Sequence, residues 1–384
     1  MASTVVRQAI GGAAGLALVA VLACGGSGGG TQPAAPPAAP PTAKPAPAAP
    51  APAGQAAAKP EPATKAPEAA KPAAPAAASG SAQRLTMACC ASTSSHYAWY
   101  VAAAKSINDK VPEVNITVVE SGASVENIKR MAKDEINIGQ VQNDAAYWGY
   151  NGVEAFKDAP VKDIRVLFFY TLSAVHHAVR EDTGIKTPEE LNGKDFNAGM
   201  RGSGTEAQVK LVYESLGIKP KWYVGGLEDA VAAVKDKRIA GLAKAGIGYA
   251  LDASVLDLQT ATPVRILQFG EDHGKKIKER VPYVPFVKVP ANSYKGQAAE
   301  FWTNAVITGP TATTKLADDL AYKIVKAAVE GKSAHEQAFA AAKEVDYAKL
   351  TVEQALSPIH KGALKYYREL GLQIKPEAIG PEAQ

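Results

Sequence analysis

The sequence predicts an α/β fold made of two lobes with a ligand cleft between them. Three observations predict it. From Arg84 onward, short apolar strands alternate with amphipathic helices, and the alternation runs through two successive blocks of the chain. Such alternation specifies a mainly parallel sheet with helices on both faces, so two blocks indicate two lobes. Before Arg84 there are no aromatic residues, and residues 31–80 are mostly Ala and Pro, which cannot build a core; about 300 residues are left for the folded part.

The N-terminal composition excludes a third domain. Of residues 31–80, 36 are Ala or Pro, and no aromatic residue precedes Tyr97. The net charge of the folded part is close to zero. The first 83 residues carry five basic and two acidic side chains, so the remainder of the chain has a net charge of only +1. A net charge this close to zero disfavours a domain that binds nucleic acid.

The first 23 residues are expected to be a signal peptide. Arg7 precedes the apolar run of residues 9–23, which is too short to span a bilayer and has the length of a signal-peptide hydrophobic region. The run ends in Val-Leu-Ala-Cys at residues 21–24, which resembles the lipobox of bacterial lipoproteins and makes Cys24 the expected lipidation site. An ordinary signal peptide with an incidental Cys24 is the alternative. The only other cysteines are the neighbours Cys89 and Cys90, so Cys24 has no evident disulfide partner.

Residues 24–83 are expected to form a disordered tether. They begin with Gly and Ser and continue as Ala/Pro repeats with scattered charges. Gly-rich chain is flexible and Pro-rich chain extends by ~3 Å per residue, so ~50 such residues could hold a domain on the order of 100 Å from a lipid bilayer.

The first block of alternating elements predicts lobe 1. The β-branched residues of 115–120 favour a strand, and Ser124 is a good N-cap for the helix that follows. The expected strands are 84–91, 115–120, 136–141 and 164–170, and the expected helices are 96–108, 124–133 and 144–150.

The second block predicts lobe 2, and the last third of the chain is expected to be helical and to pack on lobe 1. The expected strands are 196–200, 222–224, 240–245 and 264–268, and the expected helices are 205–216, 227–235, 249–258, 315–330, 334–345 and 352–370. We therefore expect one domain over 84–384, with lobe 1 at about 84–178 and 286–384 and lobe 2 at about 179–285.

Ligands of such folds bind at the carboxyl ends of strands, in the crevice between the lobes. Four segments follow expected strands: residues 89–95, 140–144, 200–205 and 244–246. In residues 201–205 (RGSGT), glycines permit close backbone approach, and the following helix presents unpaired N–H groups. Arg201 beside them could grip a carboxylate with two hydrogen bonds. We therefore expect an anion site here, with a plain helix cap and a solvated Arg201 as the alternative.

Five segments give the chain a resemblance to a known family. They are residues 122–127 (GASVEN), 140–144 (QVQND), 201–206 (RGSGTE), 281–285 (VPYVP) and 359–371 (IHKGALKYYRELG). In this order and spacing they resemble the TAXI solute-binding subunits of TRAP transporters, over essentially all of 84–375. The resemblance implies a type II periplasmic-binding-protein fold that captures a small organic acid, such as glutamate, 2-oxoglutarate or another dicarboxylate. It also implies delivery of the acid to TRAP membrane subunits, with no cofactor.

The resemblance also suggests the ligand-binding residues. The family's Thr- and Gly-rich loop falls on residues 89–98, where cysteines stand in place of glycines, and the family's Gln-Ser-Asp becomes residues 142–144. His176 lies where the chain is expected to cross between lobes. The expected set is Cys90, Ser92, Ser95, Tyr97, Gln142, Asn143, His176, Arg201, Gly202, Ser203, Gly204, Thr205 and Gly246.

Two other classes of function stay open. An enzyme would need a nucleophile, base or metal constellation, and the sequence has no Gly-x-Ser-x-Gly, His-Glu-x-x-His or Cys-x-x-Cys motif, so we expect no catalysis. A soft-metal or redox protein could use Cys89 and Cys90 with a nearby histidine. Adjacent strand residues point to opposite faces, however, so only one of the two thiols is expected to enter the cleft. We expect two free, mostly buried thiols, with Cys90 narrowing the cleft.

Overall fold

The computed structural model describes residues 82–384. The expected signal peptide, Cys24 and nearly all of the expected tether lie outside these residues. Within residues 82–384, no helix is both long enough and apolar enough to cross a membrane.

Lobe 1 is built on three parallel strands in the order β2-β1-β3, with the returning strand β11 antiparallel beside β3. Its strands are β1 (Gln83–Ala88), β2 (Val114–Val119), β3 (Ile138–Gln142) and β4 (Ile164–Val166), and its first helices are α1 (Ser95–Lys110), α2 (Ser124–Ala132) and α3 (Asn143–Asn151). Every residue of β3 is buried, since the strand lies between β1 and β11 inside the sheet.

Lobe 2 is built on parallel strands β7-β6-β8, with β5 antiparallel beside β8 and β9 beside β5. Its strands are β6 (Asp195–Asn197), β7 (Lys221–Trp222), β8 (Gly241–Ala245) and β9 (Val264–Leu267), and its helices are α4 (Gly204–Ser215), α5 (Leu227–Lys235), α6 (Ala253–Ala261) and α7 (Glu271–Arg280). Strand β10 (Phe286–Val289) pairs with the first residues of β11.

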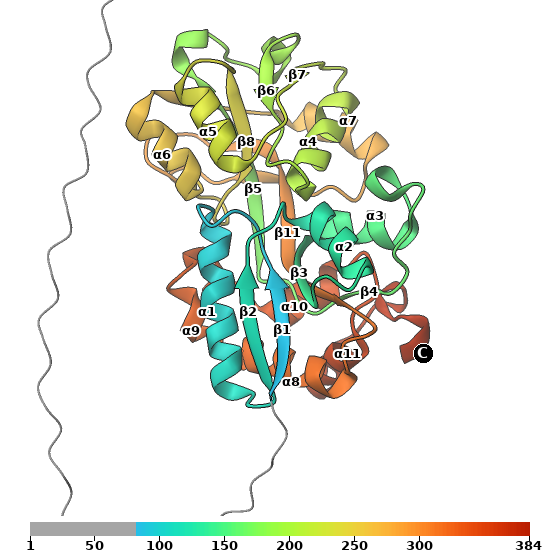
Figure 1. The fold of residues 1–384 in the computed structure, drawn as a ribbon. Coiled ribbons are helices and arrows are strands. Elements are labelled where there is room, and N and C mark those ends of the chain that lie inside the picture. Colours follow the sequence, from blue (N-terminus) through green and yellow to red (C-terminus); the bar gives the residue numbers. More distant parts are fainter. Residues whose placement is uncertain (1–81) are drawn as a thin grey trace, which may run out of the picture. The chain divides into compact units, whose positions relative to one another are not determined.

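Two long strands join the lobes, β5 (Thr171–Arg180) and β11 (Phe301–Thr313), and both run through the waist of the molecule in Figure 1. Their antiparallel pairing spans 171–174 and 305–308, after which β5 continues into lobe 2 and β11 into lobe 1. The type II periplasmic-binding-protein fold, with two α/β lobes, is therefore confirmed.

The crossing points differ from the sequence-based division at 178–179 and 285–286. The chain crosses near Ala174 and near Ala305, in the middle of continuous strands. A strand that passes from one sheet into another carries no turn residue at the crossing. Strand β11 was missed altogether, because Pro310 stands inside it and a proline argues against a central strand.

The C-terminal helices pack against lobe 1, as Figure 1 shows for α8 and α11 below the sheet. They are α8 (Asp318–Glu330), α9 (Ser333–Glu336), α10 (Tyr347–Gln354) and α11 (Lys361–Glu369). The single helix expected over 352–370 was wrong. Pro358 cannot continue a helix, and the interrupted segment instead forms a bridge between Ile359 and Val166.

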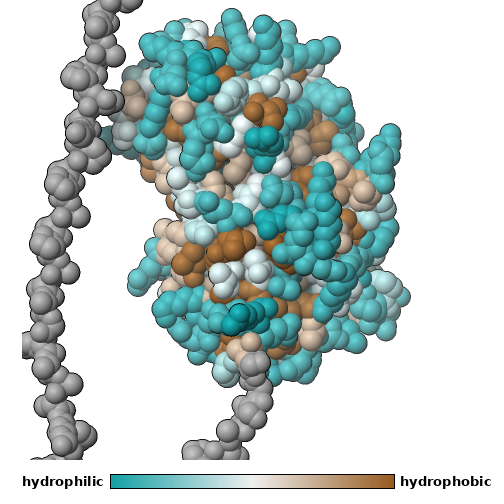
Figure 2. All heavy atoms as spheres, viewed as in Figure 1, coloured by the Kyte–Doolittle hydropathy of each residue, from teal (hydrophilic) through white to brown (hydrophobic). Residues whose placement is uncertain are grey.

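An aromatic cluster anchors the helices to lobe 1. Trp99 on α1 stacks on Tyr170, with ring centroids 3.6 Å apart, and its indole N–H donates to the Tyr347 hydroxyl on α10. All three side chains are buried, and they fix the start of α1 beside the end of β1. Figure 2 shows hydrophilic side chains over much of the visible face of both lobes, with paler and hydrophobic residues at the waist between them.

Candidate functional site

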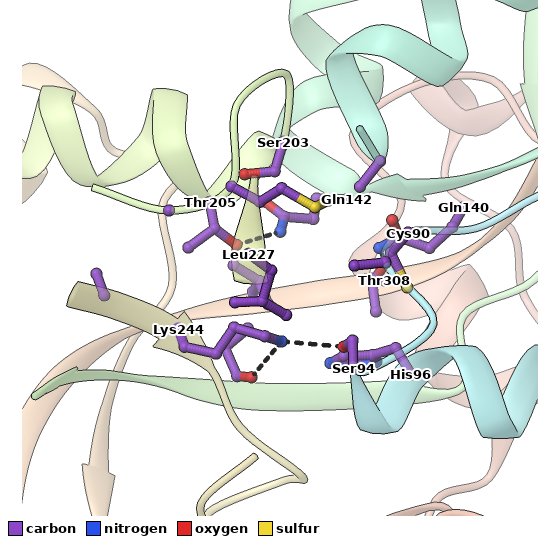
Figure 3. A pocket seen from close by; sticks show the side chains of 17 residues that line it. Cys90, Ser94, His96, Gln140, Gln142, Ser203, Thr205, Leu227, Lys244 and Thr308 are labelled. Atoms are coloured by element: carbon purple, nitrogen blue, oxygen red, sulfur yellow. Dashed lines mark hydrogen bonds between the residues drawn. The ribbon is translucent and has the colours of Figure 1, made fainter. Parts of the chain in front are cut away.

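A cavity of about 40 Å³ lies between the lobes, at the carboxyl ends of β1, β3 and β8. Its polar lining is Ser94, His96, Gln140, Gln142, Ser203, Thr205, Lys244 and Thr308, and its apolar lining is Cys90, Ala91, Ala123, Gly199, Met200, Leu227, Ala243, Ala245 and Val306. Figure 3 shows the labelled side chains converging from both lobes. At ~10–15 Å³ per water, the space corresponds to a few water molecules.

Strand β3 contributes two amides to this cavity. Gln140 and Gln142 lie two residues apart and therefore project from the same face of the strand. The Gln140 amide nitrogen donates to the Thr308 hydroxyl at 2.6 Å, and the Gln142 amide nitrogen donates to the Thr205 hydroxyl at 2.7 Å. Both amide oxygens are buried and have no hydrogen-bond partner within the described chain.

Lys244 is the only lysine or arginine of residues 82–384 that lines the cavity. Its ammonium donates to the Ser94 hydroxyl at 3.1 Å and to the Ala245 carbonyl at 3.2 Å, and it lies 3.3 Å from a carboxylate oxygen of Asp252. The Lys244 side chain is 12% exposed and that of Asp252 is fully buried. A buried charge requires such a partner, and the pair spans β8 and the start of α6.

Asp252 also joins lobe 2 to the start of α1 in lobe 1. One carboxylate oxygen accepts from the Ser95 amide at 3.1 Å, and the other accepts from the amide and hydroxyl of Ser254. Burial alone would raise the pKa of Asp252, but the Lys244 charge and the Ser254 hydrogen bonds lower the pKa to about 2. The carboxylate therefore stays ionised and favourably placed at the N-terminus of α1.

His96 lies next to this ion pair and is uncharged near neutral pH. Burial, followed by the nearby Lys244 charge, lowers the pKa of His96 to about 3. One ring nitrogen lies 2.5 Å from the Tyr170 hydroxyl. His96 therefore offers the cavity a neutral ring and leaves Lys244 as its one positive charge.

The start of α4 differs from the expected anion site. Ser203 caps α4 by accepting from the Glu206 amide, and the Glu206 carboxylate reaches back to the Gly202 amide at 2.9 Å. The chain's own carboxylate therefore occupies the end of the helix where an external anion was expected. Ser203 and Thr205 line the cavity with their hydroxyl groups.

Gly202 and Gly204 hold the lobes together. The Gly202 carbonyl accepts from the amides of Val125 and Glu126 at the start of α2, at 3.0 and 3.1 Å. A Cβ atom at Gly204 would lie 2.4 Å from the Gln142 amide oxygen, so the glycine allows Gln142 to lie this close. The close backbone approach that was expected of these glycines is therefore made to the other lobe.

Arg201 lies outside the cavity. Its side chain is exposed and lines an outer groove that it shares with Glu120, Glu228 and Asp229. The Arg201 amide donates to the carbonyl of the buried Gly225 at 2.9 Å, so the backbone of Arg201 is paired within lobe 2 while its side chain is exposed.

Several other residues of the expected set also lie away from the cavity. Ser92 is exposed, and its backbone amide donates to the Glu120 carboxylate. The Ser95 hydroxyl accepts from the Ala253 amide. Tyr97 packs half-buried against the core of lobe 1. The Asn143 amide binds the backbone of Gln354 and Leu356 and so fixes the C-terminal helices.

His176 and Gly246 pack against each other on neighbouring strands instead of facing the cavity. A Cβ at Gly246 would lie 2.7 Å from the His176 ring, and His176 lies edge-on to Tyr294. His176 is buried, and burial lowers its pKa to about 3.

Cys89 and Cys90 follow the end of β1, and both thiols are free and buried. Their sulfur atoms lie 2.6 Å apart, and Cys90 lines the cavity. Only one of the two cysteines lines the cavity, as expected, although the two sulfur atoms are close together because the strand ends at Ala88 and its alternation ends there too. Burial, followed by the Cys90 contact, raises the pKa of Cys89. Within residues 82–384, no group of three His, Cys, Asp or Glu side chains could hold a metal ion.

A chain of buried hydrogen bonds connects the lobes behind the cavity. Asp144 on α3 accepts from Gln208 on α4 at 2.7 Å, and Gln208 accepts from Asn304 on β11 at 2.6 Å. Asn304 contacts His177 at 2.9 Å, and His177 contacts the Tyr213 hydroxyl at 3.1 Å. Burial raises the pKa of Asp144 to about 6, although the Gln208 hydrogen bond opposes the shift.

Sequence reasoning missed the ion pair and one of the two amides. Lys244 belongs to a segment that was singled out because it follows a strand, but only Gly246 was chosen from it. Gln140 could have been found from Gln142, because side chains two apart on a strand share a face. Asp252 gave no signal, since it follows no strand and reaches the site only through the packing of α6.

A protein-family model matches residues 87–371, and its description is NMT1-like family. The chain belongs to the NMT1-like family. The match covers both lobes and most of the C-terminal helices, so the NMT1-like assignment applies to the folded part as a whole.

Solved structures resemble this NMT1-like chain only distantly. The ligand binding component of an ABC-type import system from Staphylococcus aureus with zinc bound is 12% identical, over 78% of this chain and 97% of that one, with a TM-score of 0.45. The periplasmic aliphatic sulphonate binding protein SsuA from Escherichia coli is 15% identical, over 75% and 83%, with a TM-score of 0.40. The protein GshT of Streptococcus mutans, described for glutathione import, is 11% identical, over 73% and 99%, with a TM-score of 0.42. These similarities are too low to decide which ligand the present chain binds.

Proposed function

We propose that this NMT1-like protein is an extracytoplasmic solute-binding receptor that captures a small organic acid and delivers it to the membrane subunits of a TRAP-type transporter. The observation that carries the proposal is the cavity between the lobes, lined by the buried Lys244 and by two glutamines whose buried amide oxygens have no hydrogen-bond partner within the described chain. Two lobes joined by two strands can close over a solute and exclude water from it. The solute leaves unchanged, because the proposed role is binding without turnover.

The acid is proposed to bind through Lys244. A carboxylate would take over one of the ammonium hydrogen bonds, most directly the one now made to the Ser94 hydroxyl. Asp252 would hold the lysine side chain in place, and the neutral His96 would not compete for the anion. A charge-assisted hydrogen bond in a site closed to water is stronger than one at the surface.

The TRAP transporter is proposed as the partner because the five segments that resemble TAXI subunits occur in order across the folded part. The membrane subunits would recognise the closed arrangement of the lobes. Purification of the receptor together with membrane subunits of the TRAP type would support this choice, and purification with subunits of another importer class would replace it.

The cell envelope is the proposed location, with the folded part held at a lipid bilayer through lipidated Cys24 and the tether of residues 24–83. Two acyl chains anchor a protein stably, whereas one chain is marginal. The change Cys24→Ala should release the protein into the soluble extracytoplasmic fraction. Retention at the membrane without Cys24 would reject the anchor.

Two lysine variants test the binding proposal. Lys244→Met should weaken binding of the acid by about 2–5 kcal/mol, the range for truncating one partner of a buried, hydrogen-bonded charge pair. Lys235→Met is the matched control. Lys235 on α5 forms an ion pair at 2.7 Å with Asp257 on α6, the helix that Asp252 caps, but this pair lies on the surface. Mass spectrometry of solute released from the purified protein identifies the acid, and calorimetric titration gives both affinities. Equal affinities in the two variants would remove Lys244 from the site.

A further inference from the structure

The two unpartnered amide oxygens of the cavity, on Gln140 and Gln142, point to the chemistry of the solute. The orientation of the Gln140 amide is fixed by its neighbours. The Thr308 hydroxyl donates its only proton to the Val141 carbonyl at 3.1 Å, so it can only accept from Gln140, and it does so from the amide nitrogen. The oxygen of Gln140 is therefore the free end of the amide, and it is an acceptor.

The second amide oxygen lies at the lobe interface. The Gln142 nitrogen is engaged by Thr205, and its oxygen lies beside the Cα of Gly204. Both glutamines are at least nine-tenths buried, at 5% and 4% exposure. A buried acceptor without a donor costs free energy, and a ligand that brings a donor removes this cost.

The positive charge of the cavity suffices for one anionic group only. Lys244 is the single cation in the lining, and Asp252 already neutralises part of its field. A second carboxylate would have to face the acceptor oxygens of Gln140 and Gln142, which repel it and offer it no proton. Desolvating a second carboxylate without a partner is strongly unfavourable.

The walls of the cavity limit the length of the solute. Four alanines line it, at positions 91, 123, 243 and 245, and larger apolar contacts come from Met200 and Leu227. A volume of about 40 Å³ fits a carboxylic acid with a short carbon chain.

We propose that the cavity selects a short monocarboxylate that carries a hydrogen-bond donor, a hydroxyl or amino group, and that it rejects dicarboxylates. The carboxylate binds Lys244, and the donor binds the amide oxygens of Gln140 and Gln142. The proposal rests on the proposed function and narrows it, since the resemblance to TAXI subunits had suggested dicarboxylates.

A matched series of acids tests the proposal on the unmodified full chain. Propionate has no donor, lactate adds a hydroxyl, alanine adds an ammonium group, and malonate and succinate add a second carboxylate. Calorimetric titration should give lactate or alanine at least tenfold higher affinity than propionate, with no binding of malonate or succinate. A comparison of the affinities of lactate and alanine shows whether the site prefers a hydroxyl or an amino donor.

The variant Gln140→Met tests whether Gln140 causes the preference for an acid that carries a donor. It keeps the length of the side chain and removes the acceptor, so the advantage of lactate or alanine over propionate should fall below threefold while propionate still binds. Lys235→Met on the surface should leave the whole series unchanged. The series on the unmodified protein stands even where Gln140→Met fails to fold.

The outcomes separate the two proposals. Tight binding of a dicarboxylate that depends on Lys244 would overturn the monocarboxylate inference and leave the receptor function standing. A donor preference that persists in Gln140→Met would also overturn the inference. Binding of no acid at all, in the series and among solutes released from the purified protein, would overturn both.

Discussion

The two sides of the cavity hold the lobes together by different means. On the α6 side, the charged contact consists of Lys244 and Asp252 from lobe 2 with Ser94 and Ser95 from lobe 1. On the α4 side, the neutral contact consists of residues 202–205 from lobe 2 with Gln142 and the start of α2 from lobe 1. The charged contact depends on a buried ion pair, and the neutral contact depends on backbone closeness and amide hydrogen bonds.

Solute binding and lobe closure are therefore coupled differently at the two contacts. A buried ion pair is costly to break, so the charged contact should respond strongly to removal of either partner. The neutral contact contains ordinary hydrogen bonds, each of which contributes about 1 kcal/mol, and should respond more weakly. An anion that binds Lys244 acts on the first contact, whereas a donor that binds Gln142 acts on the second.

The largest effect is expected from Asp252→Asn. Removing one partner of a buried pair costs about 3–5 kcal/mol, because it leaves the Lys244 charge uncompensated. Denaturant unfolding of the full chain measures the loss. The exposed pair provides the control, and Asp257→Asn should cost about 0–1 kcal/mol. The double variant Lys244→Met with Asp252→Asn should be more stable than Asp252→Asn alone, and no recovery would contradict the ion-pair account.

The pKa of Asp252 adds an acid limit to the charged contact. Its pKa is about 2 in the folded protein, below the ~3.9 of an unfolded chain. The stabilisation is therefore fully present above about pH 4 and is lost as the pH falls through about 2. The unfolding free energy of the unmodified protein should fall more steeply than that of Asp252→Asn between pH 4 and 2. Parallel curves would count against a paired, ionised Asp252.

The next effect is expected from Gly204→Ala, which tests the neutral contact. The new Cβ would lie 2.4 Å from the Gln142 oxygen, so the lobes must separate or Gln142 must move, at a cost of about 1–3 kcal/mol. Small-angle scattering should detect a larger radius of gyration. Gly270→Ala, where the nearest atom is 3.9 Å away, is the matched control. Adding Gln142→Ala should restore closure, and an unchanged radius in Gly204→Ala would show that the contact yields without opening.

A weaker and pH-dependent effect is expected from Asp144, behind the neutral contact. Its folded pKa of about 6 lies above the unfolded value, so its contribution to stability declines as the pH rises from about 4 to 6. The buried His177, with a pKa of about 4, acts in the opposite direction over the same range. The difference in unfolding free energy between the unmodified protein and Asp144→Asn should therefore shrink or reverse with rising pH. A difference that stays constant from pH 4 to 6.5 would contradict the raised pKa.

The thiols report whether the cavity opens. Cys89 and Cys90 are buried, so a thiol reagent should label them slowly in the folded protein and should label two thiols per folded domain after unfolding without reductant. Gly204→Ala should speed the labelling of Cys90, which lines the cavity, more than that of Cys89. Labelling only after reductant is added would mean that the pair is oxidised.

The smallest effect is expected from Arg201→Ala. Because the side chain is exposed and outside the cavity, stability should change by less than about 0.5 kcal/mol, and solute affinity should stay the same. A clear loss of affinity would return Arg201 to the binding site and would extend the charged contact to the α4 side.

The two-lobed α/β fold could be predicted from the amino-acid sequence, because strand and helix periodicities are local properties of the chain. Part of the neutral contact could be predicted as well. Ser203, Thr205 and Gln142 follow expected strands, and the structure brings all three to the cavity. Glycine and N-cap patterns indicate a close approach, but they do not indicate whether a ligand or the other lobe approaches.

The charged contact and the exposed position of the Arg201 side chain, in contrast, depend on how distant segments pack. Lys244 and Ser94 are 150 residues apart and meet through the packing of lobe against lobe, which no local pattern encodes. Arg201 is exposed, and its amide binds the backbone of Gly225, a neighbour only in the folded chain. The crossing strand β11 was likewise hidden, since Pro310 lies inside it and a proline argues against a central strand.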